Sequence, residues 1–227
     1  MKKLQSMDTR NRQIMTLAQI LSSGLLKDNP ARLEERPELF KKSCEMVCPS
    51  FEINDANRGL MNDIYKYIER REGRLNPSKG LWLWGPIGTG KSTIIQIMNM
   101  YDKLANGLSM GGYPIGGFMI ELASTVATKF AAKGSDGLEP YTYNYGNVRT
   151  ISFDELGREP LPAKHFGTEL NVMQYVFQCR YEFRGEAHTH VTTNLTLNEV
   201  QKKYGDHIAD RINEMFNVIE VRGRSRR

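Results

Sequence analysis

The sequence predicts an α/β fold of three layers, with a mostly parallel sheet of five strands preceded by a short helical segment. Two observations predict it. Short apolar runs typical of buried strands alternate with segments whose apolar residues recur every three or four positions, as in helices. A glycine-rich loop, Gly-Pro-Ile-Gly-Thr-Gly-Lys-Ser, follows the first of these strands and precedes a helix. A phosphate-binding loop in that context is typical of nucleotide-binding α/β domains.

Length and composition are typical of a globular protein with one sizeable core. Of the 227 residues, 40% are hydrophobic and 25% are charged. No apolar run reaches membrane-spanning length, and the first residues lack the apolar stretch of a secretory signal, so we expect a cytoplasmic protein without a membrane partner. The three cysteines fit a reducing compartment, and free thiols are favoured over a zinc site. A net charge of +5 is consistent with a polyanionic partner.

The first 49 residues are expected to form a small helical segment. Apolar residues recur at helical spacing over residues 14–21, and a second helix is predicted over about residues 32–47, ended by Pro49. A segment of this size buries little core by itself, so it should pack on the main domain or bind a partner. The sequence does not favour either role. Residues 50–227 are expected to form the nucleotide-binding domain.

The phosphate loop supplies each residue type that a polyphosphate site needs. Its glycines allow backbone amides to point into one concavity, where Lys91 would reach the β- and γ-phosphates. Ser92 would ligate Mg²⁺, and Thr93 would open a helix whose positive end faces the anion. Residues 81–84 should form the buried strand before the loop. We therefore predict that ATP and Mg²⁺ bind at Gly85, Pro86, Gly88, Thr89, Gly90, Lys91, Ser92 and Thr93.

Periodicity predicts further elements around this loop. A helix capped by Asn54 or Asp55 should end near Gly73, before the first strand. Residues 118–120 should form the second strand, and the alanine-rich residues 123–133 should form a helix. The order of these elements, helix after strand, is the one that a parallel sheet requires.

Three tyrosines alternate in the polar stretch that follows. If this stretch were extended, the rings of Tyr141, Tyr143 and Tyr145 would lie on one side. They could then stack on exposed bases of single-stranded nucleic acid. A loop packed by its own tyrosines is the alternative, and it is the favoured interpretation.

A third strand is predicted over residues 148–153, and it leads into two acids, Asp154 and Glu155. In an ATPase with a phosphate loop, Asp154 would hold Mg²⁺ through water. Glu155 would orient and polarise the attacking water. An Asp-Glu pair after a strand could merely cap the next loop, but the phosphate loop upstream favours the catalytic interpretation.

A helix over residues 168–184 and a strand over residues 188–193 come next, and the strand closes on Asn194. At that position Asn194 could contact the γ-phosphate and the attacking water. Capping of the following helix is the competing interpretation. On the strand, His188 and His190 share one face, which favours packing over metal ligation.

The end of the chain should add two short helices, over residues 197–204 and 206–215, and a last strand over residues 217–221. The second of these helices carries Arg211. The chain closes with several arginines, of which Arg226 and Arg227 are the last.

Four motifs follow the order seen in AAA+ ATPases of the DnaC/IstB group, and the chain from about residue 50 onwards resembles that group. They are Gly-Pro-Ile-Gly-Thr-Gly-Lys-Ser, Phe-Asp-Glu-Leu-Gly, Thr-Thr-Asn-Leu and Tyr-Gly-Asp-His-Ile-Ala-Asp-Arg-Ile. The resemblance implies an AAA+ core without a separate helical lid, active as a homo-oligomer or beside a related ATPase. Arg211 matches the arginine that meets the γ-phosphate bound by a neighbouring subunit. Arg227, with Arg226 close behind, matches the second nucleotide-sensing arginine.

The resemblance also implies a function. DnaC-like proteins load the replicative helicase onto single-stranded DNA, and IstB-like proteins assist a transposase. We expect a slow ATPase, stimulated by DNA or a partner, that converts ATP to ADP and phosphate as a helicase loader, with the transposase helper as the alternative. A small-molecule kinase is less favoured because it needs neither the Asp-Glu pair nor the later asparagine. A nucleotide switch that does not hydrolyse ATP is disfavoured by Glu155.

Overall fold

The computed structural model describes residues 32–106, 108–110, 113–142 and 148–223. The chain forms two compact units. The small unit comprises Met1–Met61 and Gln96–Gly117, and the sheet unit comprises Asn62–Ile95 and Phe118–Arg227. The helix predicted over residues 14–21 lies outside the described residues.

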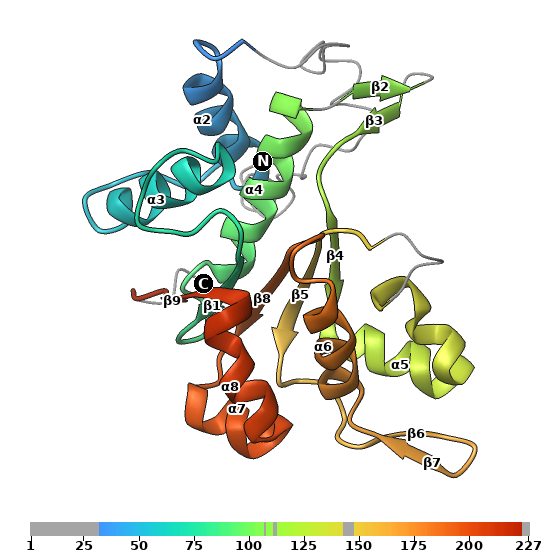
Figure 1. Cartoon of the computed structure of the whole chain (residues 1–227). Helices are drawn as coiled ribbons and strands as arrows, with labels where there is room; N and C mark the ends of the chain where they lie inside the picture. The colour runs from blue at the N-terminus through green and yellow to red at the C-terminus, as the bar shows by residue number, and fades with distance from the viewer. Residues whose placement is uncertain (1–31, 107, 111–112, 143–147, 224–227) are drawn as a thin grey trace, which may run out of the picture. The chain divides into compact units, whose positions relative to one another are not determined.

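Five strands form the main sheet of the sheet unit: β1 Gly80–Trp84, β4 Met119–Leu122, β5 Ile151–Leu156, β8 Thr189–Thr193 and β9 Phe216–Glu220. All neighbouring strands are parallel, in the order β4-β5-β8-β1-β9 (Figure 1). The predicted fold class is therefore confirmed, and each strand overlaps a segment that the sequence predicted. Because β8 lies between β5 and β1, the carboxyl ends of these three strands meet at one edge.

The helices that lie wholly or partly in the sheet unit are α3 Arg58–Ile68, α4 Lys91–Asn106, α5 Ala123–Lys133, α6 Val172–Glu182, α7 Leu197–Tyr204 and α8 Asp206–Met215. Helices α5 to α8 bury apolar side chains on one face of the sheet, in a single cluster with Trp82, Phe153 and Val191. On the other face, Tyr67 of α3 contacts His190, with ring centroids 6.3 Å apart. Helices on both faces give the predicted three layers.

Local signals place the later helices where the sequence predicted them. Thr196 caps α7 in a capping box with Glu199, and the bounds of α7 and α8 agree with the prediction. Helix α6 begins four residues later than expected, after Asn171, whose side chain accepts a hydrogen bond from the backbone of Gln174. The residues before it form a hairpin of β6 Ala163–His165 and β7 Thr168–Leu170, which the sequence analysis did not foresee.

The tyrosine-containing stretch after α5 begins as a short 3-10 helix, η1 Gly134–Tyr141. Tyr141 is buried, packs against Phe153 at a centroid distance of 6.1 Å, and donates a hydrogen bond of 2.8 Å to Glu121. Burial raises the pKa of its hydroxyl to about 12. The packing interpretation therefore holds for Tyr141, while Tyr143 and Tyr145 lie outside the described residues.

The small unit contains α2 Arg36–Val47, most of α4, and a hairpin of β2 Leu108–Met110 and β3 Tyr113–Ile115. Helix α2 confirms the predicted helix before Pro49. It packs on α4 through Phe40, whose ring meets Tyr101 edge-on at 5.5 Å, and through a hydrogen bond of 3.0 Å from Arg36 to Asn106. The proposed partner-binding role of this segment stays a prediction.

Two further findings concern properties that the sequence addressed. Among the helices that the structure describes, none is long and apolar enough to cross a membrane.

His190 is fully enclosed in the sheet, where its Nδ1 accepts a hydrogen bond of 3.1 Å from the backbone of Leu81. The prediction that His190 packs rather than binds a metal agrees with this contact.

Candidate functional site

The predicted site residues lie at the carboxyl ends of three neighbouring strands. The phosphate loop follows β1, the acidic pair lies in the last half of β5, and Asn194 follows β8. Because parallel strands end at the same edge of a sheet, the fold gathers segments that are far apart in the sequence. Contacts given below join the phosphate loop to β5 and β5 to β8.

The phosphate loop has the backbone conformation that its glycines predict. Gly85 has a φ of 141° and Gly90 a φ of 93°, both in the region that residues with a side chain rarely adopt. A Cβ atom at Gly85 would lie 2.6 Å from the carbonyl oxygen of Val221, so only glycine fits there. A Cβ at Gly90 would instead meet no atom within 4 Å, so at this position the positive φ alone favours glycine. Thr89 closes the loop with a hydrogen bond of 3.0 Å to the carbonyl oxygen of Pro86.

Lys91 begins α4 and turns its side chain back into the loop. Its Nζ donates to the carbonyl oxygens of Gly85 at 2.8 Å and Pro86 at 2.7 Å, and the residue is only 7% exposed. Carbonyl oxygens are neutral acceptors, whereas a phosphate oxygen carries charge and binds an ammonium group more strongly. The loop therefore holds a buried cation at its centre, in a position where a polyphosphate is the stronger partner.

Asp154, the first of the two acids, is in contact with the phosphate loop. Ser92 Oγ donates a hydrogen bond of 2.8 Å to Asp154 Oδ1, and Asp154 is 9% exposed. A serine hydroxyl beside a carboxylate is a pair of hard oxygen ligands of the kind that Mg²⁺ prefers. In the part of the chain that the structure describes, no three His, Cys, Asp or Glu side chains group to hold a metal ion.

Thr192 of β8 connects the two acids, and the sequence analysis gave it no role. Its hydroxyl donates to Asp154 Oδ1 and accepts a hydrogen bond of 3.0 Å from the backbone N–H of Glu155. The residue is 1% exposed. The motif Thr-Thr-Asn-Leu could have predicted this contact, because two adjacent hydroxyls on a buried strand both need hydrogen-bond partners.

Glu155 lies at a β-bulge in the centre of the site. The pairing of β5 with β8 shifts register between Phe153 and Leu156, and Glu155 has a φ of 55°. A positive φ at a residue with a side chain costs about 1–3 kcal/mol and is typical of functional positions. The Glu155 carboxylate accepts a hydrogen bond of 3.1 Å from Arg158, a second contact that the sequence analysis missed.

Asn194 is exposed in the bend that follows β8. The following helix is capped by Thr196, whose side chain accepts a hydrogen bond of 3.3 Å from the backbone of Glu199. The competing interpretation, in which Asn194 caps that helix, is therefore wrong. The sensing role of Asn194 stays a prediction.

Arg211 lies on α8, with its guanidinium carbon 4.1 Å from the centre of the Tyr181 ring of α6. The Tyr181 hydroxyl in turn donates a hydrogen bond of 2.7 Å to Glu214. This stacking orients a permanently charged, planar group on the surface of the sheet unit. The role of Arg211 across a subunit boundary stays a prediction. Arg226 and Arg227 lie outside the described residues.

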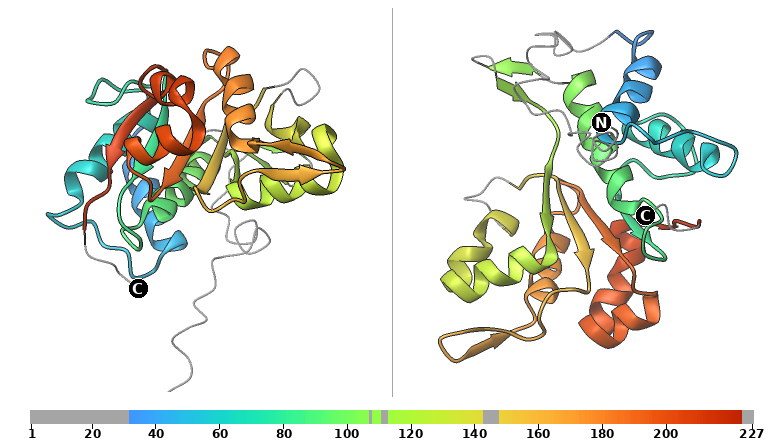
Figure 2. Two further views of the ribbon diagram at one scale, coloured as in Figure 1. Left: turned by 90° about the horizontal axis from the view of Figure 1, so that it is seen from below. Right: turned by 180° about the vertical axis from the view of Figure 1, so that it is seen from behind.

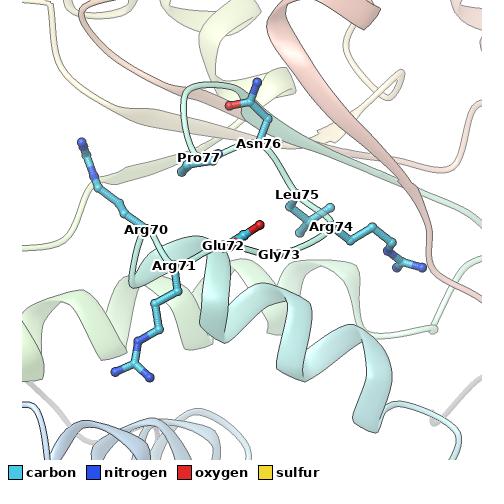
Figure 3. A pocket seen from close by; sticks show the side chains of 8 residues that line it. All are labelled: Arg70, Arg71, Glu72, Gly73, Arg74, Leu75, Asn76 and Pro77. Carbon is cyan, nitrogen blue, oxygen red and sulfur yellow. The ribbon is translucent and has the colours of Figure 1, made fainter.

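A cavity of about 350 Å³ lies in the loop before β1, at the opposite end of the sheet from the phosphate loop. It is lined by residues 70–77, which include three arginines. Figure 3 shows that the side chains of Arg70, Arg71 and Arg74 point away from one another. Arg74 pairs with Asp63 at 2.7 Å, and Arg71 contacts Glu69 at 3.5 Å. The guanidinium groups do not converge on this cavity, so it does not form a second anion site.

Comparison with known proteins extends these observations. No protein-family model and no curated protein sequence matches the chain. Solved structures do match. A provisional primosome component from Streptococcus pyogenes serotype M3 has a TM-score of 0.56 and 15% identity, covering 92% of this chain and 99% of its own. The DnaC helicase loader has a TM-score of 0.53 and 15% identity, covering 78% of this chain and 96% of its own.

A third similar structure is the replication initiator DnaA bound to AMPPCP and single-stranded DNA. Its TM-score is 0.52 at 13% identity, and the match covers 78% of this chain and 49% of the DnaA chain. At these identities the likeness concerns the fold. The chain has the α/β fold of the DnaC-like AAA+ proteins, as the motifs predicted.

Proposed function

We propose that this chain is an ATPase of the AAA+ type that acts on DNA during replication. The observation that carries the proposal is the contact between Ser92 and Asp154, at 2.8 Å, beside a loop with the backbone of a phosphate site. An ordinary glycine-rich turn does not require a hydroxyl at the start of a helix to contact a buried carboxylate from another strand. A site for a nucleotide and Mg²⁺ does require such a pair of oxygen ligands.

In this proposal the loop amides and Lys91 hold the triphosphate of ATP, and Ser92 and Asp154 hold Mg²⁺. When bound, Mg²⁺ would neutralise part of the charge on the phosphate oxygens. Thr192 fixes the Asp154 carboxylate through its hydroxyl, so this oxygen ligand is oriented before the nucleotide arrives.

Hydrolysis is assigned to Glu155, which accepts the proton of the attacking water and orients it toward the γ-phosphate. The bulge that gives Glu155 its positive φ turns this residue out of the regular alternation of β5. Asn194 contributes a polar contact to the γ-phosphate, and Arg211 acts on the nucleotide of a neighbouring subunit. Arg227 completes the set as the second sensing arginine. Turnover in the isolated chain is accordingly slow, because one chain lacks the group that its neighbour supplies.

The most specific form of the proposal is a loader of the replicative helicase onto single-stranded DNA. This form is supported by two of the similar structures, because one is a helicase loader and the other is a replication initiator bound to single-stranded DNA. The four motifs fit an IstB-like transposase helper as well. ATP binding would set the geometry between subunits, and hydrolysis would release the partner or the DNA.

The nucleotide part is tested by measuring the affinity for fluorescent ATP in the presence of Mg²⁺, for the natural chain and for Lys91→Ala. The expected result is a large loss of affinity in Lys91→Ala. Lys41→Ala is a matched control, because Lys41 is an exposed lysine of α2 that pairs only locally with Glu38. Unchanged ATP affinity in Lys91→Ala would contradict the proposal.

The partner is tested with Glu155→Gln, which should bind ATP without hydrolysing it and so retain its partner. The variant would be used with ATP to capture proteins from the host, with Lys91→Ala as the control that cannot respond to nucleotide. Capture of the replicative helicase supports the loader, and capture of a transposase supports the alternative. Capture of neither, by a variant that still binds ATP, would contradict both.

A further inference from the structure

The β6–β7 hairpin has an unusual tip. Its strands pair with Lys164 opposite Glu169 and His165 opposite Thr168, which leaves a loop of two residues, Phe166 and Gly167. Both have positive φ, 42° and 85°, the pattern of a type I′ turn. The hairpin extends away from the sheet beside α5 (Figures 1 and 2).

Neither local structure nor packing explains a phenylalanine at this position. The first residue of a type I′ turn is usually Asn, Asp or Gly, because a larger side chain is strained at positive φ. Phe166 is also 98% exposed, the highest value among the large apolar side chains that the structure describes. A residue that is both strained and solvated contributes nothing to the stability of the fold, so its role is expected to lie outside the fold.

The rest of the hairpin holds this ring in place. His165 contacts the Phe166 ring edge-on at a centroid distance of 4.7 Å, and its Nδ1 lies 3.0 Å from the carbonyl oxygen of Ala131 in α5. Lys164 pairs with Glu169 across the strands at 2.6 Å. Ala163 is buried in the core of the sheet unit. The tip is therefore anchored to α5 and presents one aromatic ring to solvent.

We propose that Phe166 stacks on a base of single-stranded DNA. The proposal rests on the proposed action of this protein on DNA and assigns one contact to it. An aromatic ring as exposed as that of Phe166 suits a nucleobase, and such stacking does not depend on base identity. The exposed Lys164, two residues before Phe166, supplies positive charge on the same hairpin, although Glu169 offsets part of it. A further exposed lysine, Lys133, ends α5, the helix to which His165 is anchored.

A protein partner fits the same feature less well. Protein interfaces bury contiguous apolar surface around an aromatic anchor. Around Phe166, by contrast, the exposed residues of the hairpin are polar or small: Lys164, Gly167, Thr168 and Glu169. A single ring on a narrow hairpin offers a protein partner too little area, but it is enough for one base.

The test compares Phe166→Asn and Phe166→Trp with the natural chain, all as full-length protein with ATP and Mg²⁺. Binding of a labelled oligodeoxythymidine is followed by fluorescence anisotropy. Phe166→Asn should weaken it about 5- to 150-fold, the range measured when one stacking aromatic is lost. Phe166→Trp should keep the affinity, and its added tryptophan fluorescence should be quenched by the oligonucleotide.

Two control measurements, of melting temperature and of ATP affinity, distinguish loss of the DNA contact from misfolding of the variant. Asn suits positive φ, so Phe166→Asn should leave the melting temperature unchanged or raise it by a few degrees. Its affinity for fluorescent ATP should equal that of the natural chain. If Phe166→Asn fails to fold, the test rests on the tryptophan fluorescence of Phe166→Trp. Fluorescence that does not change when the oligonucleotide is added would refute the stacking.

Three outcomes would overturn the inference. One is equal affinity of Phe166→Asn and the natural chain for the oligonucleotide. Another is a natural chain that binds ATP but not the oligonucleotide. A third is loss of self-association in Phe166→Asn while DNA binding persists, which would assign the ring to a protein contact. A natural chain that does not bind ATP would instead contradict the proposed function itself.

Discussion

Replacing Thr192 by valine tests whether this hydroxyl positions the acids of the candidate site. Valine has nearly the same shape, so the change removes two hydrogen bonds without opening a cavity. Thr192 donates to Asp154 Oδ1 and accepts from the backbone N–H of Glu155. In Thr192→Val that N–H is left without this acceptor inside a bulge where water has little access, because Thr192 is 1% exposed.

The magnitude follows from these two bonds. A hydrogen bond to a charged group contributes about 1.5–3 kcal/mol, and a buried unsatisfied donor costs about 1–3 kcal/mol. Valine regains up to about 1 kcal/mol because it suits a β-strand. The expected loss in the free energy of unfolding is therefore about 1.5–6 kcal/mol, or about 3–24 °C in melting temperature for a chain of this size. Turnover should fall about 10- to 100-fold, as for other residues that orient a metal ligand.

The adjacent residue provides a matched control. Thr193 is equally buried, and its hydroxyl also makes two hydrogen bonds, to the carbonyl oxygen of Leu156 at 2.8 Å and from the backbone of Leu195 at 3.0 Å. Neither partner is an acid of the site. Thr193→Val should therefore lose stability while it keeps the Mg²⁺ dependence of turnover. Equal effects of the two variants on turnover, or normal turnover in Thr192→Val, would refute the reasoning.

Three further predictions concern other groups. Arg158→Ala should raise turnover, because Arg158 competes with water for the Glu155 carboxylate. An exposed ion pair contributes about 0.2–1 kcal/mol, so the increase should be at most about fivefold. Turnover is measured as steady-state phosphate release, and a decrease would contradict the prediction. Burial lowers the pKa of His190 from 6.5 to about 3, so the unfolded chain binds the extra proton between these values and stability is lost as the pH falls from about 6.5 towards 3. The slope should be about 1.4 kcal/mol per pH unit in urea titrations, and His190→Asn should remove it; an unchanged slope would assign the acid sensitivity to other groups. Burial also raises the pKa of the Cys44 thiol to about 12, so iodoacetamide at neutral pH should label the less buried Cys48 first, and the reverse order, read by peptide mass spectrometry, would refute this.

The sequence was most informative where a pattern has one physical explanation. The phosphate loop could be located because its glycines, lysine and serine have no common use together outside a polyphosphate site. Helices α7 and α8 were predicted with their observed bounds, because Gly205 interrupts the pattern between them and has a φ of 87°. The two acids were singled out because a phosphate loop lies upstream of them, although the structure places them within β5 rather than after it.

One feature that was missed depends on contacts between distant segments, because Thr192 meets the two acids only after β5 and β8 are paired with a bulge. No local pattern predicts where a register shift falls. The Arg158–Glu155 pair, by contrast, is local, because its partners lie three positions apart in the sequence. The β6–β7 hairpin was overlooked for a different reason, because Phe166-Gly167 is not one of the dipeptides that signal a type I′ turn.

Strand β8 shows how the site and the fold constrain each other. It is the central strand of a parallel sheet and all five of its side chains are buried, yet only Val191 is apolar. Central parallel strands are normally rich in aliphatic residues, because a buried polar group without a partner costs stability. Here each polar side chain has a partner: Thr189 accepts from Arg180 at 2.6 Å, His190 accepts from Leu81, Thr192 bridges the acids, and Thr193 bonds the end of β5.

An aliphatic strand would pack this position at least as well, so stability alone does not account for the polar composition of β8. What the hydroxyls add is orientation. The contact of Thr192 fixes a carboxylate that Ser92 of the phosphate loop also touches, and the contact of Thr193 fixes the backbone just beyond Glu155. Because Ser92 contacts Asp154 and Thr192 links Asp154 to the backbone of Glu155, we expect a displacement of Ser92 to affect both acids. We therefore expect nucleotide binding to shift Asp154 and Thr192 before it affects Asn194, which follows β8.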